Sequence, residues 1–110
     1  VSRARRISES VLLSSWVGSI PNAQAVAAQA ADEMLDISGI RASYVLTQIG
    51  ETIYISARSI DEVNVQIIME RLGGGGHLNI AGAQLKDTTI EEAIQKLKDT
   101  LDVMIEEKAI

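Results

Sequence analysis

The sequence contains no cysteine and only one histidine and one proline among its 110 residues. Without cysteine, the chain can form neither disulfide bonds nor thiolate metal sites, and it has no cysteine nucleophile. No apolar run approaches the ~18 residues that a membrane-spanning helix requires, and no signal peptide is recognisable. These absences argue against a disulfide-bonded secreted domain, and we expect the chain to reside in the cytoplasm.

Basic residues are also in the minority. The chain has 10 Lys and Arg against 15 Asp and Glu, a net charge of −5 and a pI of about 4.8. Nonspecific affinity for duplex DNA comes from many Lys and Arg side chains on phosphates, so we do not expect duplex DNA as a partner. One local basic pocket for a small phosphorylated ligand is compatible with this composition.

The length and the 46% hydrophobic content suit one compact domain with a single core. The chain begins at Val1 and not at methionine, so we expect it to be part of a longer protein. Residues 1–9 are expected to be a linker or the end of a preceding helix, and residues 10–110 to form the domain.

Several segments of the domain read as extended, and residues 78–86 are short, small and partly extended. Residues 10–18 predict a first strand, and residues 40–49 and 52–59 predict a β-hairpin, because both are rich in β-branched residues. The loop between them is Gly50-Glu51, and glycine in its first position permits a type II′ turn. Along the second hairpin strand one face is apolar, and the other carries Tyr54, Ser56 and Arg58.

Helical periodicity appears in residues 23–37 and about 62–72. The first helix has an alanine-rich apolar stripe, which would allow close approach to a sheet. Asn22 is expected to cap this helix with its side chain, and Gly39 to end it in the left-handed conformation.

A last helix is expected to begin at Thr88 or Thr89, because a glutamate follows each threonine after three residues, the spacing of a capping box. We expect its apolar stripe to pack onto the sheet, with a dimer seam as the alternative. The sequence thus predicts an α/β fold in which a mixed β-sheet with a central hairpin is packed against helices.

Four consecutive glycines follow the second helix and precede the only histidine, in the order Gly73, Gly74, Gly75, Gly76, His77. Such a run costs considerable conformational entropy to order. It is either a flexible linker or a loop whose successive N–H groups form an anion-binding nest, and the residues alone leave both readings open. In the second reading, His77 could donate to a phosphate oxygen and Arg58 could clamp the same anion.

No catalytic constellation is recognisable. The glycine loop lacks the Gly-Lys-Ser/Thr of a P-loop, and it follows a helix, whereas a dinucleotide fingerprint opens one. The acidic pairs lie on predicted helices or helix starts, where solvated faces and caps explain them. We therefore predict no catalytic residue and no metal ligand in this chain.

The stretch Gly73–His77 resembles the signature of the DHH-associated C-terminal domain, which ends the DHH phosphoesterases. That superfamily includes RecJ-type exonucleases, nano-RNA hydrolases and cyclic-di-AMP phosphodiesterases. The resemblance covers roughly residues 10–107. Three flanking segments make the chain similar to the membrane-anchored cyclic-di-AMP phosphodiesterases of the GdpP type: Arg41–Val45, Ile55–Ser59 and Val63–Glu70.

In such proteins the preceding DHH domain holds two manganese ions, and a metal-bound hydroxide opens cyclic-di-AMP to linear pApA. The resemblance implies that this domain grips the cyclic or short linear dinucleotide from the other side. The roles carried over fall on Arg58, Gly73, Gly74, Gly75, Gly76 and His77. Ser56, Ser59 and Asn64 are weaker candidates for polar contacts near the nucleotide.

The resemblance also implies that the parent protein is anchored in the bacterial cell membrane, with its DHH domain as this domain's partner. The Asp-His-His motif is absent here, so the fragment alone is expected to be inactive. Ile80 is bulkier than the residues usual after the histidine, so no contact from Asn79 or Ile80 is carried over. The alternatives are the substrate domain of a nano-RNA-type oligoribonuclease and 3′-phosphoadenosine 5′-phosphate phosphatase, and a non-catalytic regulatory or oligomerisation module, including a homodimer.

Overall fold

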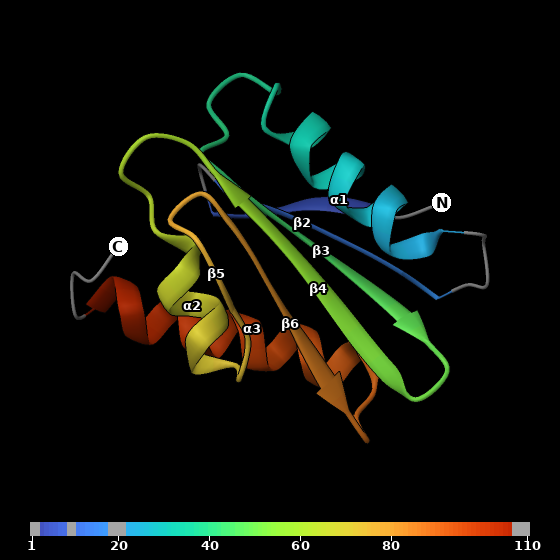
Figure 1. Cartoon of the computed structure of the whole chain (residues 1–110). Coiled ribbons are helices and arrows are strands. Elements are labelled where there is room, and N and C mark those ends of the chain that lie inside the picture. Colours follow the sequence, from blue (N-terminus) through green and yellow to red (C-terminus); the bar gives the residue numbers. More distant parts are fainter. Residues whose placement is uncertain (1–2, 9–10, 18–21, 107–110) are drawn as a thin grey trace.

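The computed structural model describes residues 3–8, 11–17 and 22–106 of the chain. In chain order the elements are β1 (Arg3–Ser8), β2 (Val11–Val17), α1 (Ala23–Met34), β3 (Ala42–Ile49), β4 (Thr52–Ser59), α2 (Val65–Arg71), β5 (Gly75–Gly76), β6 (Ile80–Lys86) and α3 (Ile90–Glu106). The strands form one sheet in the order β1-β2-β3-β4-β6-β5 (Figure 1). β2 and β3 are parallel and the other neighbouring pairs are antiparallel, which confirms the predicted mixed α/β fold.

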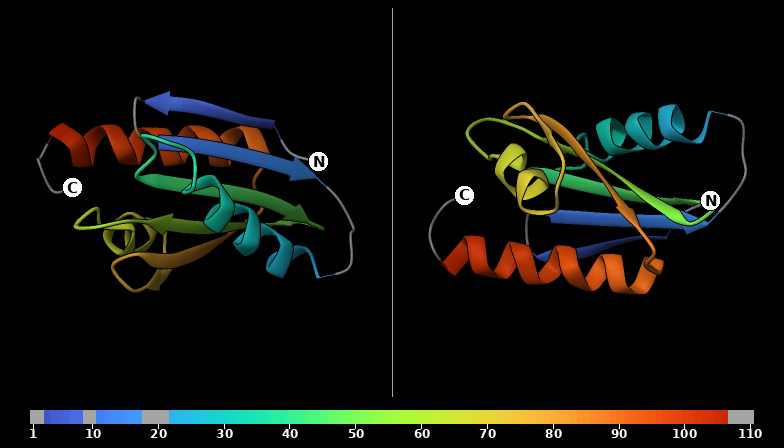
Figure 2. Two further views of the ribbon diagram at one scale, coloured as in Figure 1. Left: turned by 90° about the horizontal axis from the view of Figure 1, so that it is seen from above. Right: turned by 60° about the horizontal axis from the view of Figure 1, so that its bottom comes forward.

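The helices cover the two faces of the sheet unequally. α1 packs on one face against β3 and β4, whereas α2 and α3 share the opposite face (Figure 2). The larger core lies between the sheet and these two helices and includes Tyr44, Ile53, Ile68 and Leu97, all fully buried. The smaller core lies beneath α1. α1 is one short helix on a six-stranded sheet. The sheet face that it covers therefore stays open over part of β4 and β6.

The central hairpin forms as predicted. β3 and β4 pair from Ala42↔Ser59 to Ile49↔Thr52, which leaves a two-residue loop. Gly50 has a φ of 63°, and the next residue, Glu51, is not among the described residues with positive φ. This pattern is that of the predicted type II′ turn. Burial alternates residue by residue along β4, so Tyr54, Ser56 and Arg58 lie together on the α1 face, whereas Ser59 is buried on the other.

The expected linker or helix at residues 1–9 is a strand in its described part. β1 runs antiparallel to β2 and forms an edge of the sheet. The segment Arg-Ala-Arg-Arg-Ile-Ser lacks the apolar alternation of a half-buried strand, so its sequence gave no strand signal. Its pairing satisfies backbone groups of β2 that would otherwise form the open edge.

The ends of α1 also differ from expectation. Asn22 stands at the N-cap position, but its φ of 58° is left-handed and its side chain makes no capping hydrogen bond. Its carbonyl accepts from the Val26 N–H at 3.0 Å instead. The helix ends at Met34 and not at residue 37, so Gly39, with a φ of 87°, lies in the turn that leads to β3.

The other two helices keep their predicted positions, although α2 begins at Val65, three residues later than expected. Thr89 caps α3, because its hydroxyl accepts from the Glu92 N–H at 3.1 Å. The apolar stripe of α3 packs onto the sheet as predicted, through Ile94, Leu97, Leu101 and Met104. None of the described helices is long and apolar enough to span a bilayer.

Candidate functional site

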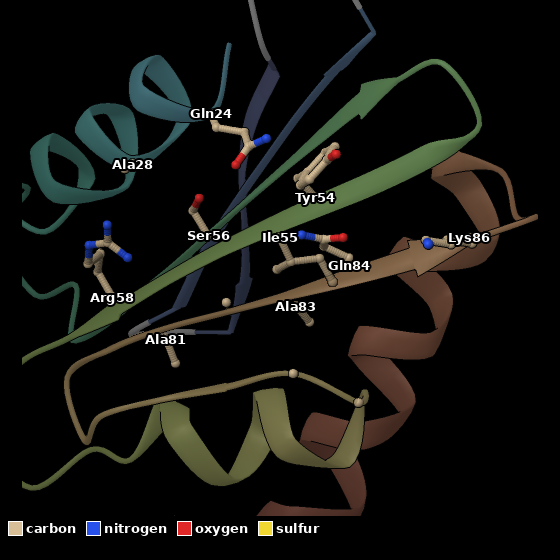
Figure 3. Close-up of a pocket in the computed structure, with 13 residues that line it drawn as sticks. Gln24, Ala28, Tyr54, Ile55, Ser56, Arg58, Ala81, Ala83, Gln84 and Lys86 are labelled. Atoms are coloured by element: carbon tan, nitrogen blue, oxygen red, sulfur yellow. The ribbon is translucent and has the colours of Figure 1, made fainter. Parts of the chain in front are cut away.

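The open part of the α1 face carries a cleft of about 780 Å³ over β4 and β6 (Figure 3). Its floor is made of small residues, because Ser56 of β4 lies opposite Gly82 of β6. α1 contributes Gln24 and Ala28 to one wall. The remaining lining residues belong to the two strands and the glycine loop: Tyr54, Ile55, Arg58, Gly73, Gly74, Ala81, Ala83, Gln84 and Lys86.

The cleft is basic although the chain is acidic. Arg58 and Lys86 are its charged lining residues, and no aspartate or glutamate belongs to the lining. Over the whole chain acidic residues outnumber basic ones by 15 to 10. Positive charges in a concave surface focus the electric field on bound anions. The charged residues of the lining thus suit an anionic ligand, and the Asp32 carboxylate beside Arg58 offsets part of their charge.

Arg58 is held at one end of the cleft by α1. Its Nε donates to Oδ1 of Asp32 at 2.9 Å, and its Nη1 donates to the Ala57 carbonyl at 2.9 Å. The Arg58 side chain is 13% exposed, whereas that of Asp32 is 63% exposed. These contacts occupy two of the five N–H donors of a guanidinium, which leaves the others for an anion. The predicted place of Arg58, at a strand end among polar neighbours, is confirmed.

The first two glycines of the loop terminate α2. The Gly74 N–H donates to the Met69 carbonyl at 2.8 Å, and the Gly73 N–H donates to the Glu70 carbonyl at 3.1 Å. Together with the φ of 88° at Gly73, these bonds form a Schellman motif. The prediction of an anion nest is therefore wrong for the N–H groups of Gly73 and Gly74, because helix carbonyls already use them.

The second and fourth glycines allow the loop to lie against β6. A Cβ at Gly74 would meet the Gly82 carbonyl oxygen and would stand 2.7 Å from the Ala83 Cα. A Cβ at Gly76 would stand 2.5 Å from the Ala81 Cα. The loop is thus not a flexible linker, since Gly75 and Gly76 pair with β6 as strand β5.

His77 and Arg58 lie at the same end of the sheet. Gly76 pairs with Ala81 and Arg58 with Ile80, and the His77 N–H donates to the Ile80 carbonyl at 2.7 Å. This register places His77, Ile80 and Arg58 in one row across the sheet. At the usual strand spacing, the Cα atoms of His77 and Arg58 are roughly 10 Å apart. His77 is exposed and is not among the residues that line the cleft. Its N–H, like those of the first two glycines, is engaged within the protein.

Two of the three weaker candidates have roles in the fold. The buried Ser59 hydroxyl donates to a backbone carbonyl at 2.6 Å and accepts from the Asn79 side chain at 2.9 Å. The Asn64 side chain accepts from the Ile67 N–H at 3.3 Å and so caps α2. Ser56 does line the cleft.

Four polar residues of the cleft were not identified from the sequence: Gln24, Tyr54, Gln84 and Lys86. Their proximity depends on the pairing of β4 with β6 and on the position of α1, which no local pattern specifies. The one signal available was the alternation along β4, which places Tyr54 on the same face as Arg58.

Ionisable groups with shifted pKa values lie outside the cleft. Burial raises the pKa of the Tyr44 hydroxyl, which is part of the larger core. The pKa of Glu62 is lowered, first by a hydrogen bond from its own backbone and then by the Arg41 guanidinium, whose Nη2 is 3.2 Å from the carboxylate. Neither residue contacts the cleft, so neither pKa shift marks an acid or base there.

The residues that the structure describes do not fit a metal centre. Within the described ranges, no three His, Asp or Glu side chains gather closely enough to hold a metal ion. The cleft itself offers amides, a hydroxyl, a phenol and two cations. Such groups bind and orient an anionic organic ligand by hydrogen bonds and charge.

The sequence pattern of the DHHA1 domain matches residues 10–107. The chain is 54% identical over 79 residues to the cyclic-di-AMP phosphodiesterase GdpP of Geobacillus thermodenitrificans, an alignment that covers 71% of the chain. It is 55% identical over 78 residues to the cyclic-di-AMP phosphodiesterase PdeA of Listeria monocytogenes, which covers 70% of the chain. The alignments span 12% of each relative, so this chain corresponds to a small part of them.

Solved structures share the fold at lower sequence identity. An exopolyphosphatase-related protein from Bacteroides fragilis superposes with a TM-score of 0.75 at 24% identity, over 86% of this chain and 29% of that protein. The C-Ala domain of alanyl-tRNA synthetase from Aquifex aeolicus superposes with a TM-score of 0.66 at 18% identity, over 90% of this chain and 97% of that domain. Together with the match over residues 10–107, these findings confirm the resemblance seen in the sequence: the chain belongs to the DHHA1 domain family.

Proposed function

We propose that this chain is the substrate-binding domain of a DHH-family phosphodiesterase, and that its cleft holds cyclic-di-AMP or its linear product pApA. The observation that carries the proposal is the basic cleft, with Arg58 oriented at one end, on the surface of an acidic domain. The relatives that are 54% and 55% identical are named as cyclic-di-AMP phosphodiesterases, which supports this substrate class.

In this proposal the chain binds and orients the dinucleotide, and the rest of the parent protein hydrolyses its phosphodiester bond. Arg58 can donate two hydrogen bonds to one phosphate, an arrangement that fixes the anion's orientation as well as its position. The described residues offer no metal cluster, so the proposed manganese ions belong to the parent's DHH domain. That domain, in the same polypeptide, is the proposed partner, and the parent is proposed to be membrane-anchored.

The glycine loop forms part of the wall of this site. Gly73 and Gly74 line the cleft, and the absence of a side chain at Gly74 lets the loop lie directly against Gly82 and Ala83 of β6. His77 is proposed to reach the ligand from the rim, because it shares a row with Arg58 but lies outside the cleft. Asn64 and Ser59 are left out of the proposed contacts, since the fold already uses their polar groups.

Chemical-shift mapping tests this assignment. We expect titration of the ¹⁵N-labelled chain with pApA or cyclic-di-AMP to shift the amides of Ser56, Arg58 and Gly82 while leaving those of α3 unchanged. The isolated chain presents part of the binding surface, so we expect a dissociation constant of about 1 mM or weaker. Shifts confined to α3, or none at about 10 mM ligand, would contradict the proposal. Cleavage of the ligand by the purified chain would contradict the division of labour.

Replacement of Asp32 by asparagine should strengthen anion binding. Asparagine keeps an oxygen that can accept from the Arg58 Nε but removes the negative charge beside the guanidinium. A unit charge at about 5 Å in a mostly aqueous surrounding is worth about 1 kcal/mol, so Asp32→Asn should tighten pApA binding roughly fivefold. The same titration measures it, and the gain should shrink as salt is added. Asp36→Asn is the matched control, and weaker binding by Asp32→Asn would contradict this account.

A further inference from the structure

An aromatic ring and two amides meet at the part of the cleft farther from Arg58. Tyr54 of β4 lies directly opposite Gln84 of β6, and Gln24 projects from α1 into the same space (Figure 3). The Tyr54 side chain is half-buried, whereas both glutamines are exposed. The ring is therefore held by the sheet while the two amides face a ligand that would enter the cleft.

The spacing between this group and Arg58 matches one nucleotide. Tyr54 and Arg58 are four residues apart on one face of β4, about 13 Å between their Cα atoms at the usual rise of a strand. The Arg58 guanidinium is held beside α1 by Asp32, and the floor between Arg58 and Tyr54 is only Ser56 and Gly82. A phosphate bound at Arg58 thus leaves room for the ribose over the small residues and for the base near Tyr54.

The chemistry of the group suits a nucleobase. Every base has a π-face that stacks on an aromatic side chain. A glutamine amide offers an adjacent acceptor and donor, which complement N6 and N7 of adenine. Guanine presents two acceptors along the corresponding edge and pairs better with a cation.

We propose that Tyr54, Gln24 and Gln84 form a nucleobase subsite in which the tyrosine stacks an adenine ring and the amides read its edge. This inference rests on the proposed function, because it assumes that Arg58 holds the phosphate of the same nucleotide. It adds residues that determine specificity to a site otherwise defined by charge alone.

The test compares ligands that share a phosphate but differ in the base. AMP, GMP and ribose 5-phosphate are titrated into the ¹⁵N-labelled chain, and the dissociation constants are compared as ratios. The wild-type chain should bind AMP at least about 10-fold more tightly than ribose 5-phosphate. Tyr54→Ala should reduce that ratio severalfold, because only the amide contacts to the base remain, and Tyr54→Phe should retain most of it. A ratio that Tyr54→Ala does not change would overturn the subsite.

The amides are tested by the preference between bases. Gln84→Ala and Gln24→Ala should each lower the AMP-to-GMP affinity ratio, by about fivefold for the residue that makes the bidentate contact. Gln29→Ala is the matched control on α1, because Gln29 bonds to Glu33 and does not line the cleft. An unchanged ratio in both cleft variants would overturn the edge reading.

Failure of this inference is distinguishable from failure of the proposed function. If ribose 5-phosphate and AMP bind equally, with shifts at Arg58, the anion site stands and the base subsite is wrong. If neither ligand shifts the cleft amides while the chain is folded, both proposals are wrong. Circular dichroism and thermal unfolding of each variant exclude loss of structure as the cause of a change.

Discussion

Arg58→Ala is expected to weaken binding of pApA about 10- to 100-fold. Hydrogen bonds that involve a charged group contribute about 1.5–3 kcal/mol each, and the Arg58 guanidinium is the cation held inside the cleft. The substitution also removes the partner of Asp32, which leaves a carboxylate beside the anion site and opposes the ligand further. Chemical-shift titration of the purified chain with millimolar pApA measures the change.

Two further variants test whether the shape of the Arg58 guanidinium or only positive charge is needed. Arg58→Lys keeps the positive charge but loses the planar fork and the Nε contact with Asp32, so we expect an intermediate loss. Arg41→Ala is the matched control, because Arg41 is paired with Glu62 at 3.2 Å and is not a lining residue. If Arg41→Ala weakens pApA binding as much as Arg58→Ala, binding depends on overall charge and the assigned site is wrong.

Most of the helices and strands could be predicted from the sequence, because its local signals agree with one another. The two-residue loop at Gly50, the alternation along β4 and the cap at Thr89 each act over a few residues, and each is found where predicted. β1 was missed because an edge strand needs no apolar face, and its pairing with β2 is a tertiary contact.

The site was predicted less completely, for a physical reason. Arg58 and the glycines are visible as a strand end and a loop, but Gln24, Gln84 and Lys86 are surface polar residues with no pattern of their own. They become a site only when β6 pairs with β4 and α1 lies across the sheet. The structural roles of the four glycines could not be predicted either, because a sequence does not show which glycine packs against a neighbouring strand and which one ends a helix.

The glycines should therefore differ sharply in their tolerance of substitution. Gly74→Ala would drive a methyl group into the Gly82 carbonyl oxygen and to 2.7 Å from the Ala83 Cα, both backbone atoms of β6. Since a backbone strand cannot yield as a flexible side chain can, β5 and β6 would have to separate. We expect a loss of about 3 kcal/mol in the free energy of unfolding and a fall in Tm of roughly 10–20 °C.

Gly75→Ala supplies the matched control within the same loop. A Cβ at Gly75 meets no atom within 4 Å, and its φ is not in the left-handed region. Alanine there restricts the unfolded chain without strain in the folded one, so stability should stay within about 0.5 kcal/mol or rise slightly. Thermal and urea unfolding of the two variants measure the difference. Equal stability of Gly74→Ala and Gly75→Ala would mean that close packing on β6 is not the reason for glycine at position 74. If glycine is needed at position 74 only for contact with the ligand, the two variants should differ in pApA affinity and not in Tm.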